Sequence, residues 1–336
     1  MNDSEIADFW LNVVPGWALA EALFFVADRR VADVIGDDPT DISVIAEKTA
    51  TNPDAMQRLL NTLCSRGIFQ RTGKSQFSPT PLSRPLRSDT PDSQRAYIAL
   101  GHRMIKPSWS MLDHSMETGE PAFDTRFGAP PFDYMKDNES MAQAFAEGMT
   151  STTKRSERAL MESDAFGEFD LVVDVGGSFG SLLELLLKTR PTARGIVFDC
   201  PEIADQAARR WAERENTNFS LSAAGGNFFD SVIAGGDLYL LKQILHDWPD
   251  DACGTILGNI RSAMASGGRI AVIEMILPED GAPHPGWIYD LLMMTITGGR
   301  ERSLKQYEAL LEGEGFAVER VVTTASPLSV IVARPQ

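Results

Sequence analysis

The chain has 336 residues, of which 43% are hydrophobic and 23% are charged, an ordinary balance for a globular protein with a sizeable core. This length predicts one large domain accompanied by a smaller one. The net charge of −16 and the isoelectric point of about 4.7 argue against a protein that binds nucleic acid or anionic membranes through non-specific charge attraction.

The cysteines and the N-terminus indicate a cytoplasmic location. Cys64, Cys200 and Cys253 lie far apart and show no CxxC spacing, so we expect buried free thiols in a reducing compartment. The opening residues MNDSEIADFW lack a basic segment followed by an apolar run, so no signal peptide is predicted. No run of about 18 apolar residues is present, so no transmembrane helix and no membrane partner are expected.

Residues 11–35 are expected to form a helix that is too apolar to stand alone in water. Such a helix buries most of its surface in a core or against a second subunit, which predicts a homodimer. Two further helices are expected within 41–69, since Asp/Ser and Asn-Pro cap signals begin them and Gly67 ends the second. The segment FQRTGKSQFSPT then predicts two short strands around a turn, and this order is the outline of a winged helix.

A winged helix raises the possibility of DNA binding. Residues 1–100 hold 10 Lys and Arg against 13 Asp and Glu, a net charge of −3. A nucleic-acid reader needs a basic stripe in this region. We therefore interpret the module as a structural or dimerising one, and expect no nucleic-acid partner.

The middle of the chain, from 95 to 165, is expected to be mostly helical, with a Gly/Pro-rich irregular interruption at GEPAFDTRFGAPPFDY. From residue 169, short β-rich runs alternate with helical runs, which predicts a parallel α/β sheet. The last two strands, FAVERVVTT and LSVIVARP, are joined by a short turn and must pair antiparallel. The predicted fold is a Rossmann-like α/β sheet of about seven strands closed by this hairpin. The predicted domains are a dimerisation domain (1–95), a helical linker (96–165) and an α/β domain (166–336); the family resemblance given below implies that the linker contributes to a substrate pocket and that the α/β domain is catalytic.

A glycine-rich loop connects the first of these strands to a helix. In DVGGSFGS, Gly176, Gly177 and Gly180 would let a ligand approach backbone N–H groups. Asp199 ends the next strand, 19 residues after Gly180, where a carboxylate can accept hydrogen bonds from ribose hydroxyls. The motif alone suits NAD, FAD or S-adenosylmethionine, or a purely structural turn. Asp174, at the tip of the strand, favours a ligand with a cationic amino or sulfonium group.

The stretch DVGGSFGSLLELLLKTRPTARGIVFDCPEIADQA is similar to the cofactor region of the small-molecule S-adenosylmethionine-dependent O-methyltransferases, of the plant caffeate type and the bacterial secondary-metabolite type. GNFFDSVIAGGDLYLLKQILHDWPDD and GGRERSLKQYEALLEGEGF resemble two further signatures of that family. The resemblance runs from about residue 15 to 333. It implies a class I methyltransferase sheet preceded by a winged-helix dimerisation domain, and methyl transfer to a hydroxyl of a small aromatic or polyketide-type metabolite.

The resemblance also implies roles for single residues. The loop from Gly176 to Gly180 would hold the methionine part of the cofactor and Asp199 its ribose. The positions around the adenine would be Asn227, Phe228 and Lys242. The general base would be His246, with orienting carboxylates at Glu274 and Glu301. The substrate-pocket positions would be Phe145, Met149 and Met293.

Two residues depart from the family pattern, since Ser178 stands where Gly is usual and Asn227 where Asp is usual. Serine fits a tight loop unless its φ is positive. Asparagine keeps an acceptor but loses the charge. His102, His114 and His284 lack any motif context, and no His/Cys/Asp cluster has the ligand spacing of a zinc or iron site, so no metal is predicted.

The expected chemistry explains why a histidine is needed. A phenol with a pKa of about 10 is only about 0.1% ionised at pH 7, whereas a neutral imidazole with a pKa of about 6.5 is available as a base. A carboxylate at the other ring nitrogen, Glu274 or Glu301, would fix the tautomer. Three alternatives stay open: a same-fold enzyme of a non-methylating reaction (hydroxylation or pericyclic), a nicotinamide dehydrogenase and a winged-helix regulator.

Overall fold

The computed structural model describes residues 2–213 and 219–336. It forms two compact units. The first unit comprises Met1–Ser110 and Met135–Lys154, and the second comprises Met111–Tyr134 and Arg155–Gln336. The three domain boundaries expected from the sequence remain predictions.

The N-terminal segment is helical, but it is not one helix. It contains α1 (Asp3–Val13), α2 (Gly16–Asp28) and α3 (Val31–Ile35). Pro15 separates the first two, because proline has no N–H to continue a helical ladder. Arg30 separates α2 from α3 with a left-handed φ of 54°. The prediction of a continuous helix over 11–35 is therefore wrong at these two positions.

The α1–α2 stretch is strongly apolar and exposed within its own unit. Trp10 is 56% exposed, and Leu11 and Trp17 are each 71% exposed. By length and composition, Asp3–Asp28 is the one stretch among the described residues that could cross a membrane, which the sequence analysis did not anticipate. An exposed apolar surface of this kind is typical of a site that binds another protein or a membrane.

The rest of the winged-helix outline is present in the first unit. Its elements are α4 (Ile42–Lys48), α5 (Pro53–Cys64), β2 (Phe69–Arg71) and β3 (Gln76–Pro79). Asp41 caps α4 by accepting the N–H of Ser43, and Asn52 caps α5 by accepting the N–H of Ala55. β2 and β3 pair antiparallel, and a two-residue strand, β1 (Thr40–Asp41), adds to β3.

Helices dominate the middle of the chain, as predicted. They are η1 (Arg84–Leu86), α6 (Arg95–Leu100), the π-helix η2 (Gly101–Ile105), α7 (Lys106–Trp109), α8 (Leu112–Thr118), α9 (Ala122–Phe127), α10 (Pro131–Lys136) and α11 (Glu139–Met161). The Gly/Pro-rich segment is more regular than expected, because it contains α9 and most of α10. Gly119 and Gly128 adopt positive φ and end α8 and α9.

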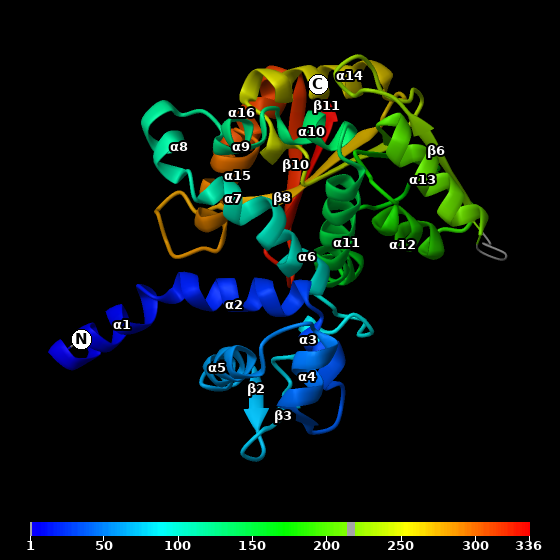
Figure 1. The fold of residues 1–336 in the computed structure, drawn as a ribbon. Helices are drawn as coiled ribbons and strands as arrows, with labels where there is room; N and C mark the ends of the chain where they lie inside the picture. The colour runs from blue at the N-terminus through cyan, green and yellow to red at the C-terminus, as the bar shows by residue number, and fades with distance from the viewer. Residues whose placement is uncertain (1, 214–218) are drawn as a thin grey trace. The chain divides into compact units, whose positions relative to one another are not determined.

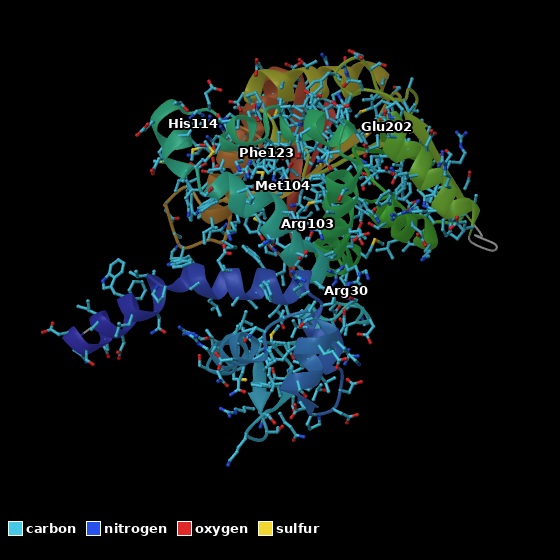
Figure 2. The ribbon with its side chains drawn as sticks, in the orientation of Figure 1. Arg30, Arg103, Met104, His114, Phe123 and Glu202 are labelled. Carbon is cyan, nitrogen blue, oxygen red and sulfur yellow. The ribbon has the colours of Figure 1, made fainter. Side chains whose placement is uncertain are left out.

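The aromatic residues of this segment pack on one another inside the second unit. Phe123 is fully buried, and its ring stacks on Phe127 with centroids 4.4 Å apart. Tyr134 lies 5.9 Å from Phe123 and 5.1 Å from Phe127, again between ring centroids. Figure 2 shows Phe123 in the interior, whereas His114 lies at the rim on α8.

The second unit is built on the predicted α/β sheet. Its main strands are β4 (Leu171–Val175), β5 (Arg194–Asp199), β6 (Ser220–Gly225), β7 (Leu238–Lys242), β8 (Arg269–Leu277), β10 (Phe316–Thr323) and β11 (Leu328–Pro335), and a short β9 (Arg302–Ser303) pairs with β8. The order is β10-β11-β8-β7-β4-β5-β6. β11 pairs antiparallel with both β10 and β8, so the predicted C-terminal hairpin and fold class are confirmed.

Helices cover both faces of this sheet (Figure 1). α12 (Ser181–Thr189) packs on one apolar face, and α14 (Asp250–Ala263) and α16 (Leu304–Gly313) pack on the other. The remaining helices of the unit are α13 (Pro201–Ala212), η3 (Leu245–Asp247) and α15 (Gly286–Ile296). Because β4, β5, β7 and β8 are parallel neighbours, their carboxyl ends meet at one edge, where such folds bind ligands.

Candidate active site

The glycine loop after β4 is shaped by backbone positions that tolerate no side chain. Gly176 and Gly180 adopt φ of +70° and +72°. A Cβ at Gly177 would lie 2.6 Å from Cγ of Asp174, and one at Gly180 would lie 2.7 Å from Cγ2 of Val197. The loop is therefore a close-packed cradle whose backbone a ligand can approach.

Asp199 is held at the end of β5 by two backbone donors. Its Oδ2 accepts the N–H of Ser178 and its Oδ1 that of Cys200, both at 2.8 Å. Burial raises the pKa of Asp199, and these two hydrogen bonds oppose that rise. Each oxygen keeps a lone pair for a further donor, which suits the two hydroxyls of a ribose.

Asp174, which is buried, and Lys242, which is half-buried, are charged residues on the adjacent strands β4 and β7. Asp174 is 3% exposed, and its carboxylate makes no hydrogen bond to another described residue. Burial raises its pKa to about 7, although Lys242 acts against this rise. Burial also lowers the pKa of Lys242. A buried carboxylate beside the glycine loop suits a cationic group of a ligand.

The segment that carries His246 begins where β7 ends and contains η3. Oε1 of Glu274, on the neighbouring strand β8, accepts the backbone N–H groups of Ile244, Leu245 and His246 at 3.1, 3.0 and 3.3 Å. One carboxylate oxygen thus accepts hydrogen bonds from three backbone N–H groups of this turn. Glu274 therefore fixes the backbone beneath the histidine.

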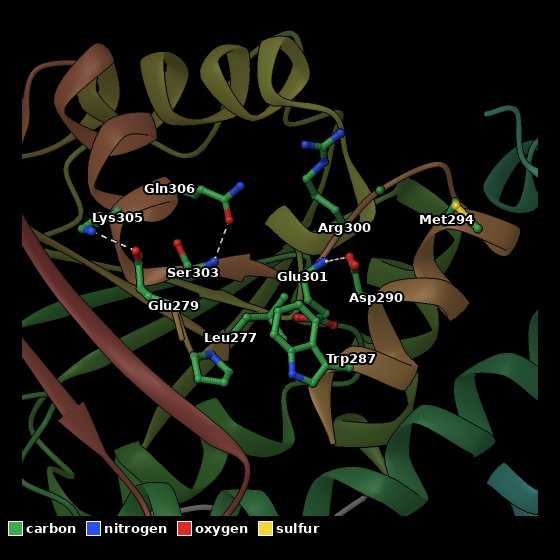
Figure 3. Close-up of a pocket in the computed structure, with 12 residues that line it drawn as sticks. Leu277, Glu279, Trp287, Asp290, Met294, Arg300, Glu301, Ser303, Lys305 and Gln306 are labelled. Atoms are coloured by element: carbon green, nitrogen blue, oxygen red, sulfur yellow. Dashed lines mark hydrogen bonds and ion pairs between the residues drawn. The ribbon is translucent and has the colours of Figure 1, made fainter. Parts of the chain in front are cut away.

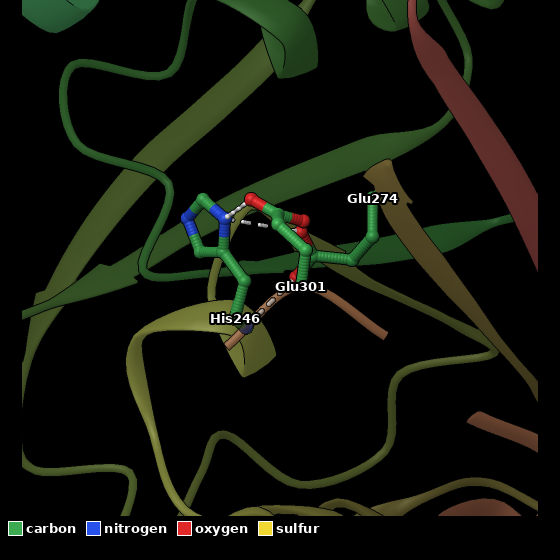
Figure 4. A group of neighbouring side chains, drawn as sticks. All are labelled: His246, Glu274 and Glu301. Carbon is green, nitrogen blue, oxygen red and sulfur yellow. Dashed lines mark hydrogen bonds and ion pairs between the residues drawn. The ribbon is translucent and has the colours of Figure 1, made fainter. Parts of the chain in front are cut away.

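Glu301 contacts the imidazole itself. Its Oε1 lies 2.8 Å from Nδ1 of His246, whereas Oε2 of Glu274 lies 3.7 Å from the same nitrogen (Figure 4). The sequence left open which glutamate would meet the ring, and the geometry selects Glu301. The other ring nitrogen, Nε2, makes no hydrogen bond to a described residue, and its distance to Oδ1 of Asp247 is 3.9 Å.

The carboxylates change the acidity of the buried imidazole. Burial alone would lower the pKa of His246, but Glu274, Asp247 and Glu301 outweigh it and raise the pKa to about 10. The reference value near 6.5 for a free imidazole does not include these carboxylates. The carboxylates therefore strengthen the imidazole as a base, and the neutral ring is the form that can accept a proton.

Two residues of the GGRER stretch support this site without having been singled out from the sequence. Arg302 is 1% exposed and donates to the carbonyls of Leu245 and Trp248 at 2.8 Å each. At Gly299 a Cβ would overlap the carbonyl of His246. The GGRER stretch thus contacts the histidine turn through its backbone and through one guanidinium. Its neighbours in sequence are polar and charged, so nothing local distinguished Arg302.

The adenine-side candidates lie after β6. Asn227 is exposed, and its Oδ1 accepts the N–H of Phe229 at 3.1 Å. Its side-chain amide therefore stabilises the turn in which it lies. Phe228 is half-buried and meets Trp248 edge to face at 6.0 Å between centroids. These residues share the carboxyl edge of the sheet with the glycine loop and Asp199.

The substrate-pocket candidates are half-buried residues of two helices. Phe145 and Met149 lie one turn apart on α11 in the first unit, and Met293 lies on α15 in the second. Their joint role as a pocket remains a prediction. Of the other histidines, His114 bonds Thr125 at 3.1 Å through Nε2.

Two further features adjoin the site. The ligand-type atoms of His246, Glu274 and Glu301 lie within 4.8 Å of one another, a spacing that could hold a metal ion, so the absence of a metal remains a prediction. A hollow of about 630 Å³ borders Glu301, Asp290, Trp287 and Arg300 (Figure 3). His246 and the glycine loop do not line this hollow, so it is distinct from the cofactor cradle.

The strand order, the antiparallel β11, the glycine cradle and the acidic end of β5 together define a class I methyltransferase. Residues 109–317 match the model of the O-methyltransferase domain, and residues 11–89 match that of the O-methyltransferase dimerisation domain. The chain belongs to the family of class I S-adenosylmethionine-dependent O-methyltransferases.

Individual relatives agree over nearly the whole length. Phenazine O-methyltransferase of Lysobacter antibioticus is 36% identical over 98% of this chain and 96% of its own. The crystal structure of LaPhzM superposes with a TM-score of 0.94 at 36% identity, covering 98% of this chain and 99% of that one. An O-methyltransferase from neocarzinostatin biosynthesis, solved with S-adenosylmethionine and 2-hydroxy-5-methyl naphthoic acid, gives 0.81 at 30% identity, covering 95% and 96%.

Proposed function

We propose that this O-methyltransferase acts on a hydroxyl of a small aromatic or polyketide-type secondary metabolite, and that His246 is its general base. The observation that carries the second part is the hydrogen bond of 2.8 Å between Nδ1 and Glu301, which leaves Nε2 without a hydrogen bond to a described residue. The substrate class follows the relatives, whose acceptors include phenazines and a hydroxylated naphthoate.

The residues fit the cofactor. The unpartnered carboxylate of Asp174 would meet the amino group, the cradle of Gly176, Gly177 and Gly180 the methionine part, and Asp199 the ribose. Phe228, Asn227 and Lys242 would border the adenine. S-adenosylmethionine, when bound, supplies an electrophilic methyl group on a sulfonium.

The protein's own task is to hold the acceptor oxygen and take its proton. Fixing the acceptor removes translational freedom, which is worth about 7–11 kcal/mol. Nε2 of His246 receives the hydroxyl proton, and Glu301 at Nδ1 fixes the tautomer and stabilises the resulting imidazolium. Since the neighbouring carboxylates raise the pKa of His246 toward that of a phenol, the proton moves with a smaller energetic penalty.

The activity is tested with methyl-labelled S-adenosylmethionine and a panel of hydroxylated naphthoates, phenazines and simple phenols. We expect label in an O-methyl product, with one S-adenosylhomocysteine formed per methyl transferred. Analogues whose hydroxyl is already methylated serve as controls. Label transferred only to nitrogen acceptors, or no S-adenosylhomocysteine with any of them, would contradict the proposal.

We also propose a cytoplasmic homodimer in which a second copy covers the apolar α1–α2 stretch. The match of residues 11–89 to a dimerisation domain and the exposed Trp10, Leu11 and Trp17 support this arrangement. It is tested by light scattering. We expect twice the chain mass at micromolar concentration, whereas a monomer, or recovery only with membranes, would contradict it.

A further inference from the structure

Four residues other than glycine adopt a left-handed conformation in the described part of the chain. Arg30 and Ala50 lie in the first unit, at helix ends. Ser178 and Gln243, with φ of 51° and 55°, follow the neighbouring strands β4 and β7. Such conformations cost free energy for L-residues, and they concentrate at functional sites.

The backbone of Ser178 has a clear role, but its side chain does not. Its N–H donates to Asp199 at 2.8 Å, and a glycine would make the same hydrogen bond without strain. The hydroxyl makes no hydrogen bond to another described residue, and the residue is only partly buried. Among the described residues, no hydrogen bond of the hydroxyl offsets the cost of a side chain at this position.

The surroundings indicate what the hydroxyl could bind. Just before this loop, near the end of β4, Asp174 is buried and its carboxylate has no hydrogen-bond partner among the described residues. Gly177 lies directly against that carboxylate, since a Cβ there would be 2.6 Å from its Cγ. An unpartnered buried acid and an unpartnered hydroxyl on one cradle suit a ligand group that carries both a cation and an acceptor.

We propose that the Ser178 hydroxyl binds the amino-acid end of S-adenosylmethionine, donating a hydrogen bond to its carboxylate while Asp174 meets the ammonium. This inference rests on the proposed cofactor site. Ser178 is then a binding residue: its left-handed conformation lowers the stability of the ligand-free protein, and its hydroxyl raises the affinity for the cofactor.

The test compares Ser178→Gly with the native protein by calorimetric titration of two ligands. S-adenosylhomocysteine carries the amino-acid end, and 5′-methylthioadenosine lacks it. We expect Kd for S-adenosylhomocysteine to rise about tenfold, as for a lost hydrogen bond to a charged group, while Kd for 5′-methylthioadenosine changes less than about twofold. Ser178→Ala, which keeps the strain, should show the same selective loss.

The melting temperature of the ligand-free protein provides the second readout. Ser178→Gly should melt at or above the native temperature because the strain is relieved, yet gain less from saturating S-adenosylhomocysteine. Ala50→Gly is the matched control, because it relieves a left-handed residue in the first unit and should leave both Kd values unchanged.

Unchanged S-adenosylhomocysteine affinity in both Ser178 variants, or an equal loss for both ligands, would overturn the inference. Failure of the native protein to bind S-adenosylhomocysteine would instead refute the proposed cofactor site. The two failures are therefore distinguishable.

Discussion

The two halves of the site, which face the same edge of the sheet, are built differently. The glycine loop and Asp199 shape the cofactor half through the backbone, with positive φ at Gly176 and Gly180 and N–H groups aimed at a carboxylate. The His246 half is assembled from side chains that are distant in sequence, such as Glu301, 55 residues away. The residues of the glycine loop are neighbours in the sequence, whereas the side chains of the His246 cluster come together only when the protein folds. Each half should therefore fail in its own way: one in binding, the other in turnover.

Apart from replacement of His246 itself, the largest effect should come from Arg302→Met in the His246 half. Losing the guanidinium removes its hydrogen bonds to the carbonyls of Leu245 and Trp248 and leaves the weaker Cys253 thiol as their side-chain donor, so the His246 turn shifts. We expect kcat to fall about 100-fold, as for small misplacements of a catalytic group, with about 2 kcal/mol lost from the free energy of unfolding. Kd for S-adenosylhomocysteine should stay within about threefold of the native value.

Arg320→Met is the matched control, because Arg320 also donates to two backbone carbonyls, those of Asp164 and Ala165, but on a strand that does not carry the site. It should lose stability and keep its kcat. A native kcat in Arg302→Met would show that the turn is positioned without the guanidinium.

Glu301→Gln should give the next largest loss, roughly 10- to 100-fold in kcat at neutral pH, since the imidazolium loses its carboxylate. For the native enzyme, the raised pKa of His246 predicts that kcat/KM on a phenol rises with pH above neutrality, because only the deprotonated ring accepts the proton; since the phenol itself ionises at about pH 10, the profile is read below that pH. Removing a negative charge lowers that pKa, so the variant's pH profile should level off at lower pH. A pH profile that does not shift, or that shifts to higher pH, would show that Glu301 does not raise the pKa of the general base.

A smaller effect is expected in the cofactor half from Asp199→Asn. The amide cannot accept from both Ser178 and Cys200 and still serve a ribose, so Kd for S-adenosylhomocysteine should rise about tenfold. At saturating cofactor, kcat should change less than about twofold. Titration calorimetry and saturation kinetics measure the two quantities, and a loss confined to kcat would break the proposed separation of the halves.

Chelators of metal ions are expected to have no effect on turnover. Nδ1 of His246 is already hydrogen-bonded to Glu301, so we expect the cluster to serve as an acid–base group. Turnover should be unchanged by excess EDTA after dialysis. A loss that a divalent ion restores would make the three side chains a metal site instead.

The sequence predicts the parts of this molecule that depend on local chemistry. Cap residues such as Asp41 and Asn52 marked helix starts correctly, and the short turn before Leu328 required an antiparallel hairpin. The sequence did not predict β1, because a strand of two residues is too short to show an alternating hydrophobic pattern. It also did not predict the helices within 119–134, because Gly and Pro occur at helix ends as well as in loops.

The candidate site divides in the same way. The glycine spacing and the position of Asp199 after a strand were readable locally. Which glutamate meets His246, how Arg302 holds its turn and why the pKa of the imidazole rises all depend on groups that only the fold brings together. The left-handed φ of Ser178 likewise follows from the loop and not from the residue.

The most direct test of the account is the turnover of His246→Gln on two acceptors of similar shape and different acidity. On a phenol that is un-ionised at the assay pH, kcat should fall by about 10²–10⁴, and raising the pH should restore part of it. On a phenol that is already ionised, the loss should be far smaller, and S-adenosylhomocysteine affinity should be native in both cases. Near-native turnover on the un-ionised phenol, or equal losses on both acceptors, would contradict His246 as the general base.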